Sequence, residues 1–530
     1  MFYIRTVKTA SNATAVQIIR YQERKRIVIK HIGSAHTQEE LLSLQQTAQT
    51  WIEQATKQLR LFPSERKAAT LLVSTNKLKN LGFHYTFAYE TITKLFHLFA
   101  YSQIRNRLLL DLVLMRIMQP VSKVESLNLL AELFGIEHHR TDFYRSLETI
   151  SGYKQLIETK TIEFAKKHFA FDFRLVFYDV TTLYYESFTE DEDTIDMEGN
   201  VTKKGLRRNG FSKDNKHNQP QILIGLMVNK DGFPIAYEIF EGNTFEGDTF
   251  IPIVWQFKQR YGVETLTVVA DAAMISVDNV DKLKEKQLTY IVGARIGNLT
   301  SPQMATIKQD LIGETTDEKE LLSKDGRSLR IETDRGTLVC DFSFLRYRKD
   351  KREMEKQLTR AENLVEKNTE GKRTKFLMLK KDRKKKKEKL YTLNTELLQK
   401  AKLLLGIKGY YTNLFDKDQK LTNQAIIDQY HNLWHVEKAF RISKSDLQMR
   451  PIYHFKKQAI EAHVLICFMA LAVCQYMEWK TGKSTKKIIK LLKRITDARL
   501  LNTLTNEVII LRSDLSTETK KLLEKLSLPH

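Results

Sequence analysis

The sequence predicts an α/β fold built around a mixed, five-stranded sheet, and three observations support this prediction. Two short apolar runs, 174–179 and 266–271, indicate buried strands, and each ends in an aspartate. Between them, Asp231-Gly232 separates two further apolar runs, which is a strong short-range signal of a β-hairpin. The apolar residues of 250–261 recur at helical spacing, so we expect a helix between the hairpin and the second run.

The order of the elements between residues 171 and 296 narrows the fold class. Three strands come first and are expected to pair antiparallel. A helix, a strand, a second helix and a last strand follow, which is the order of a ribonuclease H-like fold. The expected strands lie at 174–179, 221–228, 234–240, 266–271 and 290–295, and the expected helices lie at 250–261 and 276–287.

The N-terminal part combines a small sheet with helices. Short β-branched and apolar stretches between Phe2 and Ile29 predict the sheet, and Thr37-Gln-Glu-Glu40 resembles a capping box that starts a helix. From about 85 to 150 the pattern is helical. The segments 122–135 and 138–150 suit a DNA-reading helix-turn-helix, with Gly135 in the turn, and they equally suit an ordinary helical hairpin.

Between about 297 and 420 the composition shifts to charged and strand-poor. This segment contains the run 380–389, in which eight of ten residues are Lys or Arg. Such a run is either a solvated surface or an arm that contacts phosphates. If it is an arm, the residues at its centre are DNA-binding: Lys384, Lys385, Lys386 and Lys387.

Composition bounds the class of partner and the compartment. The 530 residues predict about two to four domains, and the formal charge of +22 favours a polyanionic partner, nucleic acid rather than a membrane. The three cysteines form no CxxC pair, so neither a disulfide framework nor a zinc knuckle is indicated, and a reducing cytoplasm fits best. The most apolar stretch, 464–474, has about half the roughly 20 residues that a bilayer requires, so it predicts a buried helix.

Three carboxylates are the candidate catalytic residues. Asp179 and Asp271 lie at the exits of predicted strands, and Glu437 lies on a predicted helix far along the chain. Carboxylate oxygens are the ligands that Mg²⁺ prefers, and a Mg²⁺ ion keeps open positions for water and phosphate oxygens. Two such ions a few ångströms apart suit phosphodiester chemistry. The pattern therefore predicts a two-metal site.

From about 171 to 475 the chain resembles the DDE transposases of bacterial insertion sequences, in the insertion sequence 4 group. The signature of this group is Y-x2-R-x3-E-x6-K, and Tyr430, Glu437 and Lys444 fall in register with it. Asp179-Val-Thr-Thr and Ala270-Asp271 resemble the first two acidic motifs. The chain departs from the signature at its arginine position, which is Leu433; His435 or Arg441 could substitute.

The spacing of the signature residues has a physical meaning on a helix. Residues seven positions apart drift by only about 20° around a straight α-helix, so Tyr430, Glu437 and Lys444 are expected to share one face. Each step advances roughly 10.5 Å along the axis. Glu437 would then hold metal, while Tyr430 and Lys444 reach DNA phosphates on either side. The alternatives are that Tyr430 is a core aromatic and that Lys444 is an exposed charge.

The resemblance implies an enzyme that binds the terminal inverted repeats of its element, cleaves DNA strands and transfers the 3′-OH ends to target DNA. It implies two Mg²⁺ or Mn²⁺ ions held by the three carboxylates, DNA contacts from Tyr430, Arg441 and Lys444, and a homodimer in the DNA complex. A cytoplasmic, nucleoid-associated bacterial protein without a membrane partner is expected. The alternatives are a catalytically inactive, regulatory DNA-binding protein and a ribonuclease H-like nuclease that cuts without joining.

The expected organisation has six parts. They are a small sheet and helix (1–60), a helical end-binding region (61–165), the first part of the sheet domain (166–296), the basic insertion (297–420), the second part with the catalytic helix (421–480) and a helical tail (481–530).

Overall fold

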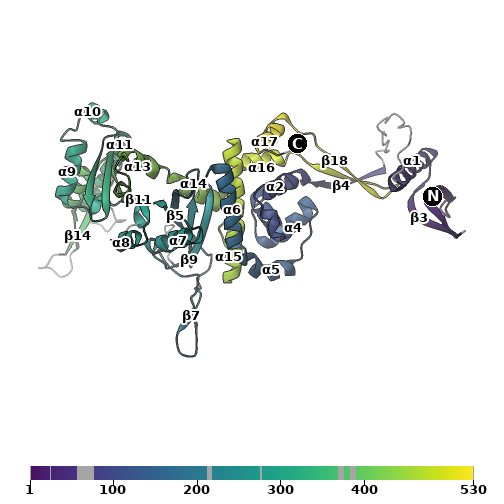
Figure 1. Ribbon diagram of the computed structural model, residues 1–530, viewed down its shortest axis with the longest axis horizontal. Coiled ribbons are helices and arrows are strands. Elements are labelled where there is room, and N and C mark those ends of the chain that lie inside the picture. Colours follow the sequence, from purple (N-terminus) through teal and green to yellow (C-terminus); the bar gives the residue numbers. More distant parts are fainter. Residues whose placement is uncertain are drawn as a thin grey trace. The chain divides into compact units, whose positions relative to one another are not determined.

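The computed structural model describes residues 2–23, 25–56, 77–211, 216, 218–274, 277–367, 375–381 and 389–528 (Figure 1). The chain forms two compact units. The first contains Met1–Leu98, Lys123–Arg140 and Met477–His530, and the second contains Phe99–Ser122 and Thr141–Tyr476. Each unit is therefore assembled from separate stretches of the chain.

The second unit is organised around one large mixed sheet. The five strands expected from the sequence form, and they are neighbours in the order β9-β8-β5-β10-β11. Strands β5, β10 and β11 run parallel, while β8 and β9 extend the sheet antiparallel from β5. The bounds are β5 (Leu175–Tyr184), β8 (Gln221–Val228), β9 (Pro234–Glu241), β10 (Thr267–Ala270) and β11 (Thr289–Ala294).

The expectation of a five-stranded sheet is wrong, because the sheet has eight strands. The three additional strands are β12 (Ser328–Thr333), β13 (Gly336–Phe342) and β16 (Ile407–Thr412), and they continue from β11 in the order β16-β13-β12. All three come from the segment expected to be strand-poor. Their apolar runs are short and lie beside highly charged helices such as α11 (Phe344–Glu366), so the average composition of the segment hid them.

In that segment the structure also describes four α-helices and a small hairpin. Strands β14 (Leu377–Lys381) and β15 (Lys389–Leu393) pair antiparallel, and the lysines at 384–387 lie between them, outside the described residues. The helices of the segment are α9 (Ser301–Leu311), α10 (Glu318–Ser323), α11 and α12 (Thr395–Leu403).

Several helices pack on the strands of this sheet. Helix α7 (Glu246–Arg260) packs against β5, β8 and β9, and α8 (Val277–Glu285) packs against β11. Helix α13 (Asn423–His431) crosses the strands from β10 to β12, and α14 (Trp434–Arg441) lies on β5 and β8. Helix α13 and helix α14 follow each other directly in the chain, so together they cover the sheet from β12 to β8.

The hairpin predicted from Asp231-Gly232 is confirmed. The amide of Asn229 donates to the carbonyl of Phe233 over 2.9 Å, and the side-chain oxygen of Asn229 accepts from the amides of Asp231 and Phe233. Gly232 has φ +80°, a left-handed conformation that glycine adopts without steric cost. These bonds close the turn between β8 and β9.

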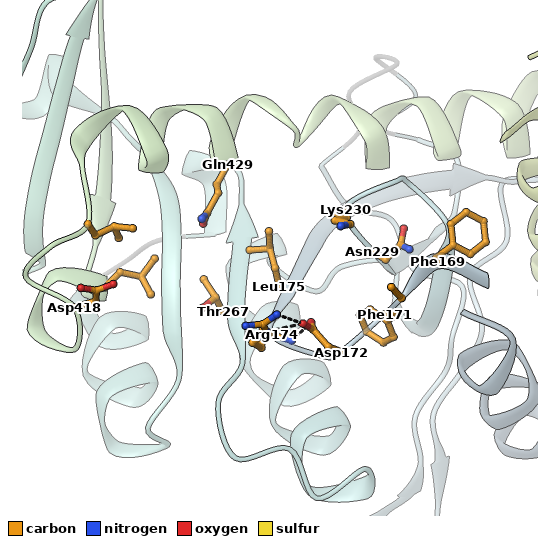
Figure 2. A pocket seen from close by; sticks show the side chains of 13 residues that line it. Phe169, Phe171, Asp172, Arg174, Leu175, Asn229, Lys230, Thr267, Asp418 and Gln429 are labelled. Carbon is orange, nitrogen blue, oxygen red and sulfur yellow. Dashed lines mark hydrogen bonds and ion pairs between the residues drawn. The ribbon is translucent and has the colours of Figure 1, made fainter. Parts of the chain in front are cut away.

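A cavity of about 350 Å³ lies at the start of the parallel strands (Figure 2). Leu175 and Thr267, the first residues of β5 and β10, line it together with Asn229 and Gln429. Arg174, also in its wall, donates through its amide to Asp172 over 3.1 Å. The cavity thus opens at the ends of β5 and β10 opposite to the end at which Asp271 follows β10.

The predicted buried helix over 464–474 is confirmed as part of a longer helix, α15 (Lys457–Thr481). Among the residues that the structure describes, α15 alone is long and apolar enough to span a membrane, and 94% of its most apolar window is buried. The ring of Tyr476 on α15 packs edge-on against Phe164 of α6 (Lys154–Phe169), with 5.0 Å between centroids, and the two helices lie side by side (Figure 1). Helix α15 is therefore a core helix.

The second unit contains further helical elements. They are α3 (Arg107–Met118), α5 (Arg140–Gly152), which begins at the unit boundary, and the 3₁₀ turns Tyr101–Ile104, Ala272–Met274, Ile296–Asn298 and Leu414–Asp416. A two-stranded ribbon, β6 (Thr194–Ile195) and β7 (Val201–Lys203), projects from the loop between β5 and β8 (Figure 1).

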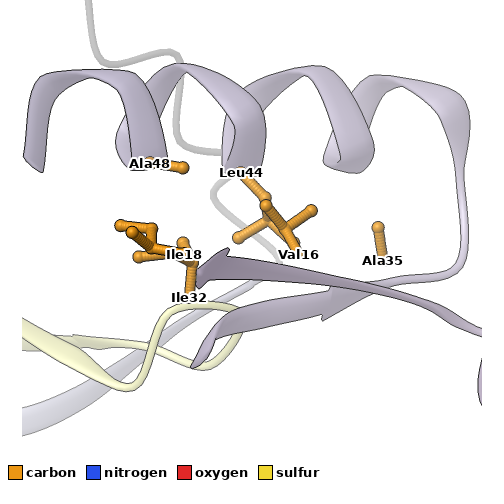
Figure 3. Packing of buried hydrophobic residues seen from close by; sticks show 6 residues of the cluster. All are labelled: Val16, Ile18, Ile32, Ala35, Leu44 and Ala48. Atoms are coloured by element: carbon orange, nitrogen blue, oxygen red, sulfur yellow. The ribbon is translucent and has the colours of Figure 1, made fainter. Parts of the chain in front are cut away.

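The N-terminal part of the first unit is a three-stranded antiparallel sheet covered by one helix. The elements are β1 (Phe2–Lys8), β2 (Thr14–Gln22), β3 (Lys25–Ala35) and α1 (Gln38–Thr56). Figure 3 shows the buried side chains between sheet and helix: Val16, Ile18, Ile32, Ala35, Leu44 and Ala48. The predicted capping box is confirmed, because the Glu40 amide donates to Thr37 Oγ1 and the Thr37 amide donates to Glu40 Oε2.

The other elements of the first unit join distant parts of the chain. Strand β4 (Leu78–His84) pairs with β17 (Asp497–Asn502), which pairs with β18 (Glu507–Arg512). The tail after 481, expected to be helical, also contains a hairpin between α16 (Thr485–Leu492) and α17 (Thr517–Lys525). Each strand of this hairpin has only six residues, and β18 is mostly exposed, so its apolar pattern is weak.

The two helices considered for DNA reading are present. Helix α4 (Lys123–Phe134) ends before Gly135, which has φ +68°, and α5 follows from Arg140. Helix α2 (Thr86–Leu98) also belongs to the first unit. The boundary between the units falls at Arg140, between α4 and α5, so a helix-turn-helix remains a prediction.

The β17–β18 hairpin contains a buried carboxylate whose removal we expect to destabilise it. Both oxygens of Asp497 accept from Arg512 over 2.8 Å, and the Asp497 side chain is 3% exposed. We expect Asp497→Asn to cost about 1–2 kcal/mol at neutral pH, a low value for a charged hydrogen bond because Arg512 is partly exposed. Differential scanning calorimetry of the full chain measures the loss.

The pH dependence of this loss follows from the same contact. The hydrogen bonds from Arg512 hold the pKa of Asp497 below its usual value. A carboxyl whose folded-state pKa is lowered stabilises the fold above its unfolded pKa, and that stability disappears as the pH falls through the folded pKa. The difference in free energy of unfolding between Asp497→Asn and wild type should therefore become smaller in acid. The control, Glu90→Gln, removes the 45% exposed partner of Arg512 and should cost less; an equal cost would contradict the expectation.

Candidate active site

Asp179 lies inside β5, not at its end as the sequence indicated, because the strand continues to Tyr184. Its neighbour Tyr178 points to α7, where the hydroxyl donates to Thr249 Oγ1 over 2.8 Å and the ring packs against Phe250. Successive side chains of a strand point to opposite faces. Asp179 therefore faces the side of the sheet that α14 covers.

Asp271 lies beside Asp179 on the neighbouring strand. Ala270, the last residue of β10, pairs with Tyr178 in the parallel ladder, so the next residues along, Asp271 and Asp179, are at the same level. Asp271 is exposed. Its Oδ1 accepts from the amide of Ala272 over 2.7 Å and from the hydroxyl of Tyr430 over 3.4 Å. The contact with Tyr430 shows that Asp271 faces the side covered by α13.

Glu437 is on α14, the helix that packs on β5. Its side chain is exposed, whereas Val436, Ala439 and Phe440 attach the helix to the fold. The negative charge of Glu437 acts on Tyr430 and on Lys408, so the carboxylate lies on the same side as Asp271. The structure thus brings all three predicted carboxylates to one face of the sheet.

The carboxylates suit a divalent cation in their chemistry, since hard cations take oxygen ligands. Among the residues that the structure describes, however, no group of three His, Cys, Asp or Glu side chains is close enough to hold an ion. Holding a metal would therefore require these side chains to move closer together. At Asp271 both hydrogen bonds given above end on Oδ1.

Tyr430 is 5% exposed and its hydroxyl donates to Asp271, so its contact with a DNA phosphate stays a prediction. Burial raises the pKa of Tyr430, and the charge of Asp271 raises it further. The hydroxyl stays protonated and can keep donating. Gly293 of β11 makes room for it, since a Cβ there would lie 2.5 Å from the Tyr430 hydroxyl and 3.1 Å from the Ala272 nitrogen.

The three signature residues do not share one straight helical face, which corrects the spacing argument. Tyr430 belongs to α13 and Glu437 to α14, and a tight turn separates them, with the Leu433 amide bonded to the Tyr430 carbonyl over 2.9 Å. Lys444 lies in a π-helical turn, Ile442–Asp446. Tight and wide turns rotate side chains by different angles from an α-helix, so the seven-residue repeat is lost.

The other candidates on this helical stretch differ in exposure. Lys444 is half-buried, Arg441 is exposed, and Leu433 is 6% exposed. His435 packs against the β8–β9 turn, where a Cβ on Gly232 would lie 3.2 Å from its ring. Burial lowers the pKa of His435, so it is neutral at neutral pH and does not replace the arginine charge.

The sequence interpretation missed a group of polar residues beside the carboxylates. Lys408 and Tyr410 of β16 lie next to Tyr430, and the Tyr410 hydroxyl is 3.3 Å from His431 Nε2. Asp341 of β13 is the cross-strand partner of Lys408, and burial raises its pKa. The available signal was the short apolar run around these residues, which the charged surroundings masked.

Residues 171–473 match the family model described as "Transposase DDE domain". This match covers more than half of the chain and contains all three carboxylates. A mixed sheet that places acidic residues on one face is thus the core of a DDE-domain protein. The chain belongs to the transposase DDE domain family.

Solved structures give weaker similarities. The piggyBac transposase synaptic complex with hairpin DNA has a TM-score of 0.35 at 10% identity, over 83% of this chain and 74% of that chain. The Mos1 transposase paired-end complex with the left transposon end has a TM-score of 0.15 at 13% identity, over 46% of this chain and 66% of that chain. Both scores are low, so the family membership rests on the sequence match. No curated protein matched the chain.

The close approach at Gly293 gives a test of the contact between Tyr430 and Asp271. We expect Gly293→Ala to displace the hydroxyl from Asp271, and a displacement of about 1 Å at a reacting centre can lower a rate on the order of a hundredfold. The measurement is single-turnover, metal-dependent DNA cleavage. Gly297→Ala is the matched control, because its Cβ would meet nothing within 4 Å. Equal rates for the two variants would show that the contact is not needed.

Proposed function

We propose that the protein is a transposase of the insertion sequence 4 group. It binds the terminal inverted repeats of its element as a homodimer, cleaves the DNA strands by metal-dependent hydrolysis and transfers the 3′-OH ends to target DNA in the bacterial cytoplasm. The observation that carries the proposal is the position of Asp179 and Asp271 side by side on parallel strands, with Glu437 on the helix that packs over β5. All three lie inside the span that matches the family.

The strand order supports a ribonuclease H-like core. Three antiparallel strands, β5, β8 and β9, are followed by α7, β10, α8 and β11, and the order in the sheet is β9-β8-β5-β10-β11. In this arrangement the first and fourth strands are neighbours. Acidic residues on these two strands therefore meet although about ninety residues separate them in the chain.

Asp179 and Asp271 would hold two Mg²⁺ or Mn²⁺ ions, with Glu437 completing the second site. When bound, such a pair of ions activates the attacking oxygen and stabilises the leaving one. Tyr430 positions the carboxylate of Asp271 by donating to Oδ1, and Gly293 keeps the space that this hydroxyl needs. Arg441 and Lys444 remain the proposed DNA contacts of the helical stretch, Arg441 because it is exposed next to Glu437.

The first test removes the carboxylates one at a time. We expect Asp179→Ala, Asp271→Ala and Glu437→Ala each to abolish strand cleavage and joining, because each loses a metal ligand, while binding of a terminal-repeat duplex stays within about twofold. The control is Asp172→Ala, which removes a carboxylate of the same unit that lies outside the site. Substantial Mg²⁺-dependent cleavage by one of the three variants would remove that residue from the site.

The same assay separates the alternatives. A regulatory DNA-binding protein would bind the repeat and neither cut nor join, and a nuclease would cut without joining. The wild-type chain is expected to bind the repeat, to cut it, and to join the resulting 3′-OH end to a target duplex. The test DNA is taken from the sequence that flanks the coding region, where the proposal expects inverted repeats.

A second test concerns the lysine run at 384–387, which carries part of the +22 charge. Replacing all four lysines with glutamine should weaken binding to every DNA sequence alike. It should also reduce the slope of log affinity against log salt, since each neutralised phosphate contributes about 0.9 to that slope. Replacement with arginine keeps the charge and should leave the slope unchanged. A glutamine variant with the wild-type slope would identify the run as a solvated surface.

A further inference from the structure

Lys408 brings a positive charge to the candidate active site from the inserted part of the sheet. It lies on β16. The two residues that follow it, Gly409 and Tyr410, pair with Ala294 and Gly293 of β11. The ammonium of Lys408 is 4.4 Å from the centre of the Tyr430 ring and 5.4 Å from that of Tyr410. The hydroxyl of the same Tyr430 contacts Asp271. One aromatic ring thus separates the ammonium from a proposed metal ligand.

The surroundings of this ammonium leave it available to an anion. Lys408 is half-buried, and within the part of the chain that the structure describes its charge contacts two aromatic rings and forms no ion pair. Burial lowers the pKa of Lys408, and Arg346 lowers it further, whereas Asp341, Asp271 and Glu437 favour the charged form. A partly desolvated charge without an ion pair is costly to a fold, and such groups concentrate at functional sites.

The helix that carries Glu437 supplies no comparable charge at the position where the group signature has arginine. That position is Leu433, which is buried. His435 is turned toward Gly232 and is neutral at neutral pH, and Arg441 is one helical turn beyond Glu437. A cation from another element could therefore take the place of the signature arginine beside Asp271.

We propose that Lys408 binds a phosphate of the DNA strand next to Asp271, so that the insertion supplies the cation that the helix lacks at Leu433. The proposal rests on the proposed function and deepens it. A lysine suits this place because its ammonium acts as a compact point charge toward phosphate oxygens. The rings of Tyr410 and Tyr430 hold the ammonium through their negative faces until a phosphate replaces part of that interaction.

The experiment combines a change in the protein with a change in the DNA. The full-length variants Lys408→Gln and Lys408→Arg are compared with wild type on terminal-repeat duplexes in which one phosphate at a time, near the cleavage position, is a neutral methylphosphonate. Dissociation constants are measured without divalent metal, and single-turnover joining rates are measured with Mg²⁺. Loss of a hydrogen bond to a charged acceptor predicts a roughly ten- to hundredfold lower joining rate for Lys408→Gln.

Double-mutant logic identifies the contacted phosphate. At one methylphosphonate position the wild type and Lys408→Gln should bind and react equally, because the partner of Lys408 has already been removed. Lys408→Arg should retain most of the wild-type rate. The control is Lys286→Gln, which removes a cation–π contact of the same 4.4 Å length, to Trp255, and should leave binding and rate within about twofold.

Two results would overturn the proposal. One is a Lys408→Gln variant that equals wild type on unmodified DNA. The other is a variant that loses the same factor at every methylphosphonate position together with a lower melting temperature, which is the behaviour of a residue that only supports Tyr430. If wild type binds the repeat but neither cuts nor joins, the proposed function fails, and the metal-free binding cycle still decides whether Lys408 contacts a phosphate.

Discussion

The parallel pairing of β5 with β10 is the constraint on which the site depends. Because Tyr178 pairs with Ala270, the residues that follow, Asp179 and Asp271, are fixed at one level on adjacent strands, which lie about 4.8 Å apart. The packing of Tyr178 on α7 then decides the face, since it turns Asp179 away from α7 and toward α14. If the pairing of β5 with β10 shifted by one residue, Asp179 would no longer lie level with Asp271 on the same face of the sheet. Two carboxylates from distant segments could then no longer act together.

The fold of residues 171–296 could be predicted from sequence because its signals are local. Each strand is an apolar run with a turn signal or an aspartate at its end, and the hairpin is marked by Asp231-Gly232. The length of β5 could not be predicted, since Thr181 and Thr182 interrupt the apolar run and are buried only because β8 and the rest of the fold cover them. The strands of the insertion were missed for a related reason, as the charges of α11 dominate the composition around them.

The sequence indicated the three carboxylates of the candidate site, but it did not indicate the residues that surround and position them. Acidic residues at strand exits are visible in a sequence, whereas the role of Tyr430 depends on a turn at Asn432 and Leu433 that no glycine or proline announces. The seven-residue spacing assumed one straight helix, and the fold bends that helix through a tight turn and a π-helical turn to cross the sheet. Lys408 could not be identified from the sequence, because its position near the carboxylates depends on the pairing of β16 with β11.

The way the first unit is assembled has a consequence for synthesis of the protein. Strand β4 pairs with β17, and His84 and Arg499 in this pair are 415 residues apart in the chain. At roughly 5–20 residues per second, a ribosome takes roughly 20–80 s to reach the partner after β4 has emerged. During this interval the backbone groups of β4 that later bond to β17 have no partner strand. Phe83, which is half-exposed in the finished fold, is then more exposed. The sheet of the second unit can therefore form on the nascent chain well before the first unit is closed.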